Sequence, residues 1–187
     1  MSLNTSLVKR LALRLKKALE ENVHPERGAT ISLLDSFLRA TLGGAPNAYY
    51  GTFPADVIPS QLTKEKRFQI IVNTSRTTDP PELGGHFVVI EGGPNNILYI
   101  DPFGNPCTQP DISQFIKDCE RSGYYSKTPI QDPSSVFCPL YCALFVLYYH
   151  LSPSWDLSFS SSDLKLNEKK CMEQIIRLID DPRLVPK

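Results

Sequence analysis

The chain has 187 residues, of which 41% are hydrophobic and 21% are charged, and its 20 lysines and arginines balance 20 aspartates and glutamates. This length and composition predict one compact domain, residues 1–187, and exclude an intrinsically disordered chain. No apolar run reaches membrane-spanning length and no signal-peptide core follows the N-terminus, so we expect a soluble, intracellular protein without membrane contact, and a monomer.

The first predicted element is an amphipathic N-terminal helix. Its apolar stripe has a four-residue spacing and contains Leu7, Leu11, Leu15 and Leu19, with Val8 and Ala12 beside them. The other side carries Lys9, Arg10, Arg14, Lys16 and Lys17. This basic face fits a contact with nucleic acid. It also fits a solvated helix surface, which the small charge excess and the lack of interleaved aromatic residues favour.

Further elements follow in a recognisable order. A second helix is predicted over residues 32–42, where Gly43 and Gly44 end it. The later elements are strands near 68–74, 86–91 and 96–101, a helix over 111–122, a buried helix over 138–151 and a C-terminal helix over 164–181. Because the strands are grouped, with connections too short for βαβ crossovers, we predict an α+β fold. We expect a central, mainly antiparallel sheet packed against the buried helix.

The start of the buried helix carries the strongest chemical signal. The sequence QDPSSVFCPLYC, residues 131–142, places Cys138 in the first turn. There, unpaired N–H groups and the positive end of the helix dipole favour thiolate over thiol. Gln131 lies seven residues upstream, in a turn rich in Asp, Pro and Ser, and can return its amide to an oxyanion forming at the sulfur. A free cysteine is commonly a core residue, but this arrangement predicts a nucleophile.

Three histidines are candidates for the base. His24 lies in a polar segment without an apolar pattern. His150 lies on the same helix as Cys138, 12 residues further on, which is about 18 Å of helical rise and too far to reach the sulfur. His86 remains, and it begins the alternating run HFVVIE, which a turn and a second run, NILYID, follow.

These two runs predict a hairpin that gives His86 an acidic partner. If the hairpin turns between Gly93 and Pro94, His86 lies directly opposite Asp101, and the carboxylate can hold the imidazole through its second nitrogen. Pro94 disfavours a two-residue primed turn, so we expect a wider loop with the same centre. An aspartate before a proline is also typical of a plain turn residue.

Five blocks of sequence resemble the adenain family, the adenovirus maturation cysteine proteases, within the larger group that includes the SUMO-specific proteases. The blocks are GTFP at 51–54, IVNT at 71–74, GGHF at 84–87, DPFG at 101–104 and QDPSSVFCPLYC at 131–142. Together they extend over roughly residues 49–147, in the family's order. The Pro-Phe-Gly after the acid favours adenain over the SUMO proteases.

The resemblance implies a role for each candidate residue. These roles are general base for His86, orienting acid for Asp101, oxyanion-hole donor for Gln131 and nucleophile for Cys138. Three positions depart from the family: Asp101 replaces glutamate, Phe87 replaces tryptophan and Pro139 replaces glycine. Proline suits the first helical turn, but it removes any contribution from the N–H of residue 139.

Our interpretation is a cysteine endopeptidase from an adenovirus-like DNA virus or related element, which cleaves virion precursor proteins next to glycine. By resemblance, it acts in the virion and the host nucleus, and DNA or a viral peptide activates it. Residues 46–151 would form the catalytic core, residues 1–45 a helical extension and residues 164–181 a C-terminal helix.

No cofactor is expected for the chemistry. The five cysteines form no C-x-x-C pair and no cluster with histidine at zinc-finger spacing, so neither a metal site nor a disulfide framework is indicated. Two alternative functions stay open. One is a deconjugase that acts on ubiquitin-like proteins ending in Gly-Gly, and the other is a catalytically silent binding module on the same fold.

Overall fold

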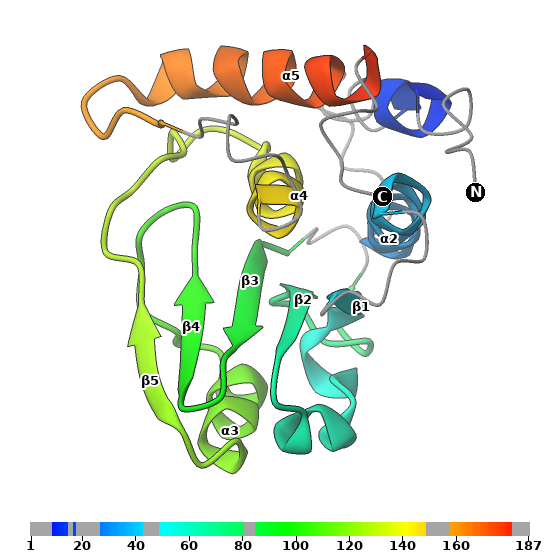
Figure 1. The fold of residues 1–187 in the computed structure, drawn as a ribbon. Coiled ribbons are helices and arrows are strands. Elements are labelled where there is room, and N and C mark those ends of the chain that lie inside the picture. Colours follow the sequence, from blue (N-terminus) through cyan, green and yellow to red (C-terminus); the bar gives the residue numbers. More distant parts are fainter. Residues whose placement is uncertain are drawn as a thin grey trace.

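The structure, a computed structural model, describes residues 9–14, 17, 27–42, 49–80, 85–148 and 158–180. It is an α+β fold in which a mixed five-stranded sheet packs against helices (Figure 1). The strands are β1 (Tyr49–Pro54), β2 (Phe68–Asn73), β3 (Phe87–Gly92), β4 (Asn96–Ile100) and β5 (Ser122–Tyr125). The helices are α2 (Arg27–Leu42), α3 (Pro110–Asp118), α4 (Cys138–Tyr148) and α5 (Leu164–Asp180), with short 3-10 helices η1 (Ala55–Val57) and η2 (Ser60–Lys64).

The sheet has the strand order β1-β2-β3-β4-β5. The two inner pairings, β2 with β3 and β3 with β4, are antiparallel, whereas the two outer pairings are parallel. The prediction of a mainly antiparallel sheet is therefore wrong. It failed because the two edge strands were not predicted, and both lack a clear period-two pattern: β1 contains a register shift beside Gly51, and all four residues of β5 are exposed.

The predicted helix over residues 111–122 divides into two elements. Its first part is α3, where the Gln109 side chain accepts a hydrogen bond from the N–H of Ile112 (2.8 Å) as an N-cap. The helix ends when Glu120 adopts a left-handed conformation, with φ of 52°. The chain then turns back and pairs as β5 with β4.

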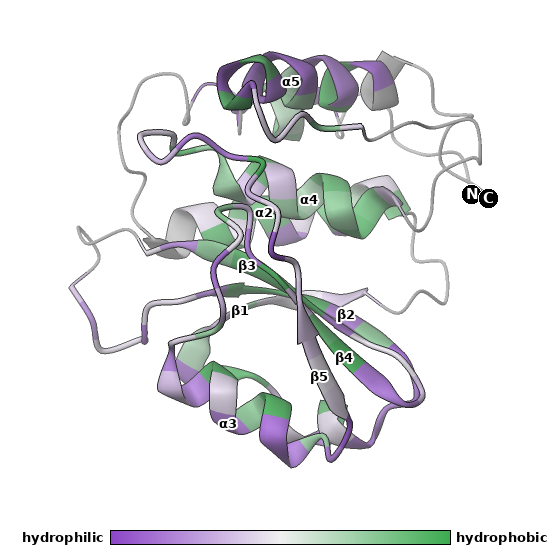
Figure 2. Ribbon diagram, turned by 90° about the vertical axis from the view of Figure 1, so that its left-hand side faces the viewer, coloured by the Kyte–Doolittle hydropathy of each residue, from purple (hydrophilic) through white to green (hydrophobic). Residues whose placement is uncertain are grey.

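Both faces of the sheet are covered, which explains why every residue of β2 is buried (Figure 1). On one face, Ile71 and Val89 belong to a core cluster shared with α2 and α4. On the other, Ile70 and Ile90 belong to a second cluster shared with α3. α4 is apolar around its whole circumference because α5 covers the side that faces away from the sheet (Figure 2).

α5 is tied to the loop before α4 by a buried asparagine. Asn167 is fully buried, and its side-chain amide donates to the backbone carbonyls of Ile130 (2.8 Å) and Ser160 (2.6 Å). The side-chain oxygen of Asn167, Oδ1, accepts a hydrogen bond from the backbone N–H of Ser160 (2.8 Å). Since buried polar groups need such partners, these bonds fix the position of α5 against residue 130.

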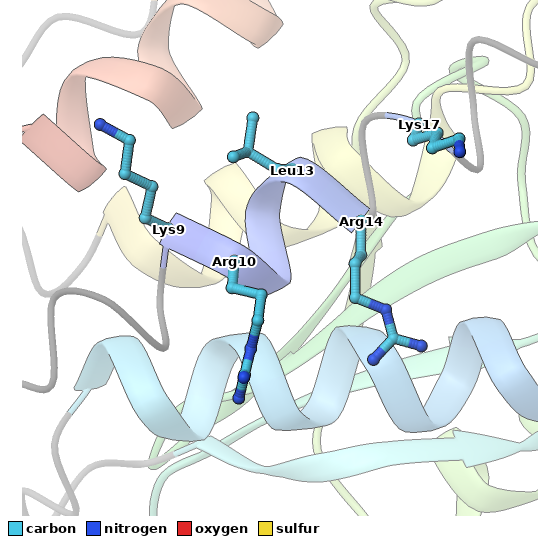
Figure 3. A pocket seen from close by; sticks show the side chains of 5 residues that line it. All are labelled: Lys9, Arg10, Leu13, Arg14 and Lys17. Atoms are coloured by element: carbon cyan, nitrogen blue, oxygen red, sulfur yellow. The ribbon is translucent and has the colours of Figure 1, made fainter.

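The N-terminal segment, residues 9–14, is helical, and Leu11 and Ala12 join the core cluster on the α4 side. The remaining apolar residues of the predicted stripe, and Lys16, lie outside the described residues. A pocket of about 510 Å³ is lined by Lys9, Arg10, Leu13, Arg14 and Lys17 (Figure 3). The basic side of this segment is therefore exposed as expected; its contact with nucleic acid stays a prediction. None of the helices in the described ranges is long and apolar enough to cross a membrane.

Candidate active site

The β3–β4 hairpin has a different register from the predicted one. Val89 lies opposite Ile100, whereas the predicted register would have placed it opposite Leu98. The turn is also tighter than expected, because the N–H of Gly93 donates to the carbonyl of Asn96 (2.8 Å) and only two residues lie between them. A two-residue shift leaves every side chain on its predicted face, so the faces of the hairpin are unaffected.

His86 and Asp101 meet despite this shift. The Nε2 atom of His86 lies 2.6 Å from Oδ1 of Asp101, whose side chain is buried. His86 precedes β3 and Asp101 follows β4, so both stand just beyond the paired residues, where the side chains meet diagonally. Thr74 fixes the backbone of His86: its N–H donates to the His86 carbonyl (2.7 Å), and its hydroxyl accepts from the His86 N–H (3.1 Å).

Cys138 completes this group of side chains. It is the first residue of α4, and the carbonyl of Phe137 accepts from the N–H groups of Leu140 (2.9 Å) and Tyr141 (3.1 Å). The Cys138 side chain is close enough to His86 to raise the pKa of its imidazole. Since Asp101 occupies Nε2, Nδ1 is the nitrogen left for the sulfur. The first-turn position of Cys138 therefore agrees with the sequence prediction, and its sulfur lies at the positive end of the helix dipole.

The charge state of His86 follows from these contacts. Burial lowers the pKa of His86, but its interactions with Asp101 and Cys138 outweigh burial and raise the pKa from 6.5 to about 9. At neutral pH the imidazole is therefore protonated between a carboxylate and the sulfur. A protonated histidine is the partner that a cysteine thiolate requires.

Gln131 lies in the loop before α4, where its side chain makes a contact that the sequence did not predict. Its side chain is fully buried, and its amide donates to the carbonyl of Ser135 (2.9 Å); the described residues include no hydrogen bond between this amide and Cys138. An amide nitrogen has two hydrogens, so one remains for another acceptor. The bond to Ser135 would then fix the direction of the second N–H.

A four-residue turn joins the acid to the Gln131 loop. The N–H of Gly104 donates to the carbonyl of Asp101 (2.8 Å), and the carbonyl of Pro102 accepts from the N–H groups of Ile130 (2.9 Å) and Gln131 (3.1 Å). Gly104 has φ of 74°, and a Cβ atom there would lie 2.8 Å from a backbone nitrogen of the Gln131 loop, so this position requires glycine. DPFG is therefore the link between Asp101 and Gln131.

The other histidines and two of the other cysteines do not join this site. His24 and His150 are outside the described residues. Burial raises the pKa of the Cys142 thiol and that of the Cys171 thiol well above the ordinary value for cysteine. Because the thiolate is the nucleophile, both are unreactive core residues. Within the described ranges, no group of three or more His, Cys, Asp or Glu side chains could hold a metal ion.

Two residues at this site had no role in the sequence prediction. Thr74 holds the His86 backbone, and the ring of Phe103 stacks on the imidazole with a centroid distance of 4.6 Å. Thr74 lies in the block IVNT and Phe103 in the block DPFG, both of which resemble the adenain family, but no spacing argument connects either side chain with His86. Only their position within those blocks could have singled them out.

Comparisons with known proteins add little. No protein-family model matches the chain, and no curated protein matches it. The chain is similar to the central domain of the uncharacterized Lpg1148 protein from Legionella pneumophila, with a TM-score of 0.43 and 14% identity over 71% of this chain and 88% of that one. It is similar to AvrA with IP6 and CoA, with a TM-score of 0.44 and 16% identity over 92% of this chain and 67% of that one. Both TM-scores are below 0.5, so neither structure indicates what this chain does.

Proposed function

We propose that this protein is a cysteine endopeptidase with Cys138 as nucleophile, His86 as base, Asp101 as orienting acid and Gln131 as oxyanion donor. The observation that carries the proposal is the chain of contacts at the start of α4. Asp101 contacts one nitrogen of His86 at 2.6 Å, and Cys138, the first residue of α4, is close enough to raise the pKa of the imidazole. A nucleophile, a base and a group that orients the base are the three parts that this chemistry needs.

The proposed reaction uses each group in turn. The proton of Cys138 resides on His86 before substrate is attacked, so the thiolate forms a bond to the scissile carbonyl carbon and the carbonyl electrons move to its oxygen. The free N–H of Gln131 and the backbone N–H of Cys138 stabilise that oxyanion. The imidazolium then gives its proton to the amine as the C–N bond breaks. Water, deprotonated by His86, then attacks the thioester carbon; the C–S bond breaks, the acid product leaves, and the thiolate and the protonated imidazole are restored.

The resemblance to adenain supports the biological part of the proposal. The substrates would be virion precursor proteins cut next to glycine, in the virion and the host nucleus of a DNA virus. Asp101 in place of glutamate shortens the carboxylate by one methylene, and the 2.6 Å contact with His86 indicates that the shorter side chain still reaches. Control by DNA or by a viral peptide belongs to the same proposal.

A substrate panel tests this function against its alternatives. We expect cleavage of a fluorogenic Leu-x-Gly-Gly peptide and slower or no release of SUMO or ubiquitin from isopeptide conjugates. Faster processing of the conjugates would identify a deconjugase. Absence of turnover on every substrate, with and without added DNA, would instead support a silent binding module.

Replacing Gln131 with alanine should lower kcat by about 10²–10³ with little change in KM, because an oxyanion donor acts mainly in the transition state. Steady-state kinetics on the fluorogenic peptide measure both constants. Gln114 provides a matched control, since its amide donates to Asp118 on the exposed side of α3. Gln114→Ala should leave both constants unchanged. A large rise in KM with kcat preserved would assign Gln131 to substrate binding instead.

A further inference from the structure

The imidazole of His86 has an aromatic neighbour on one face. The Phe103 ring lies nearly parallel to it, at 19°, with 4.6 Å between the ring centroids. The backbone N–H of Phe103 donates to Oδ1 of Asp101 (2.8 Å), the same oxygen that contacts His86. One residue therefore contacts both members of the His–Asp pair, the histidine through its ring and the aspartate through its backbone.

The backbone that carries Phe103 is held on both sides. Pro102 accepts two backbone hydrogen bonds from residues 130 and 131, and Gly104 donates to Asp101 while packing on the backbone of residues 127–129. A side chain mounted on a turn held in this way has a fixed direction. The turn geometry therefore directs the Phe103 ring toward the imidazole of His86.

The face of an aromatic ring carries partial negative charge and attracts a cation within about 6 Å of its centroid. The charged and titratable groups facing His86 in the described residues are Asp101 after β4 and Cys138 on α4. Asp101 contacts a ring nitrogen of the imidazole, whereas Phe103 stacks on the face of the ring. The contribution of Phe103 is therefore separable from that of either titratable group.

We propose that Phe103 is a positioning residue that stabilises the protonated imidazole of His86 and keeps its two nitrogens directed at Asp101 and Cys138. The catalytic meaning of this contact rests on the proposed function, but its effect on the imidazole does not. Loss of the aromatic face should make the imidazolium easier to deprotonate and should leave substrate binding unchanged.

The direct test is an NMR titration of the full chain labelled in its three histidines, with the His86 signal assigned from a His86→Gln variant. Phe103→Leu should lower the titration midpoint of His86 by about 0.4–1.5 pH units, the range expected for a cation–π contact. Phe103→Tyr, which keeps the ring, should retain the wild-type midpoint. Tyr124→Leu, on an aromatic residue 61% exposed on β5, should also retain it.

Replacing Phe103 with pentafluorophenylalanine separates the electrostatic effect from packing, because it keeps the ring shape and reverses the charge of its face. We expect a lowered midpoint with an unchanged unfolding temperature. An unchanged midpoint in this variant, or in a folded Phe103→Leu variant, would overturn the inference. If the wild type cleaves peptide, the basic limb of kcat/KM in the Phe103→Leu variant should move down by the same interval, with KM constant.

The titration requires no substrate, so the two proposals can fail separately. A shifted His86 midpoint in the Phe103 variants, together with a wild type that cleaves no substrate, would support the role of Phe103 and refute the proposed protease activity. A wild type that cleaves peptide, together with equal His86 midpoints in all Phe103 variants, would support the protease activity and refute the role of Phe103.

Discussion

Replacing Cys138 with alanine should abolish peptide cleavage, lowering kcat/KM by about 10⁴–10⁶, as expected when the nucleophile of a catalytic group is removed. The fold should survive, because the change deletes one sulfur atom at the first turn of α4. Fluorogenic-peptide kinetics measure the loss, and thermal unfolding reports the fold. Cys107 is the matched control: it is half-buried and contacts Gln109 and Ser113, so Cys107→Ala should remain active.

Chemical labelling gives an independent check on Cys138. Burial raises the pKa of the Cys119, Cys142 and Cys171 thiols, so these three should react slowly. Iodoacetamide should therefore modify Cys138 first, as read by mass spectrometry. Faster modification of Cys107, combined with full activity of Cys138→Ala, would show that the nucleophile has been assigned wrongly.

Replacing Asp101 with asparagine should lower kcat/KM by about 10²–10⁴, because the neutral amide no longer orients the imidazole or balances its charge. The pKa of His86 should fall from about 9 toward its ordinary value of 6.5, since the Asp101 carboxylate is one of the groups that raise it. The basic limb of kcat/KM should move to lower pH with it. Asp101→Glu keeps a carboxylate and should retain more activity than Asp101→Asn.

Stability should change with pH in the same variant. A raised His86 pKa contributes stability that is complete below pH 6.5 and is lost as the pH rises through about 9. The difference in unfolding free energy between wild type and Asp101→Asn should therefore be largest below pH 6.5 and decrease toward pH 9, as measured by urea unfolding.

The control for Asp101 is Asp118→Asn, which removes an exposed carboxylate that contacts Gln114 on α3. It should change neither the pH profile nor the rate. If Asp101→Asn behaved in the same way, Asp101 would be a turn residue without a role in catalysis.

The sequence was enough to predict the pairing of His86 with Asp101, although by a register that is wrong by two residues. The prediction tolerated this error because such a shift keeps each side chain on its face, and because both residues lie beyond the paired part of the hairpin. The first-turn position of Cys138 followed from the apolar run after it. Periodicity and helix-capping rules act locally, so they can locate such elements.

Features that depend on distant contacts could not be predicted. β5 has only exposed residues, and its pairing with β4 depends on where α3 ends. The direction of the Gln131 amide depends on the backbone of Ser135, which a seven-residue spacing leaves undetermined. The stacking of Phe103 on His86 requires the turn that Gly104 completes.

The two backbone hydrogen bonds of Ile130 limit which C-terminal helices could replace α5 during evolution. Its N–H donates to Pro102 and its carbonyl accepts from Asn167, so the DPFG turn and α5 both hold the residue that precedes Gln131. A C-terminal helix acquired by recombination would need an asparagine at the position of Asn167. Without it, the Gln131 loop would lose its hydrogen bond to α5. The C-terminal helix and the Gln131 loop therefore have to evolve together.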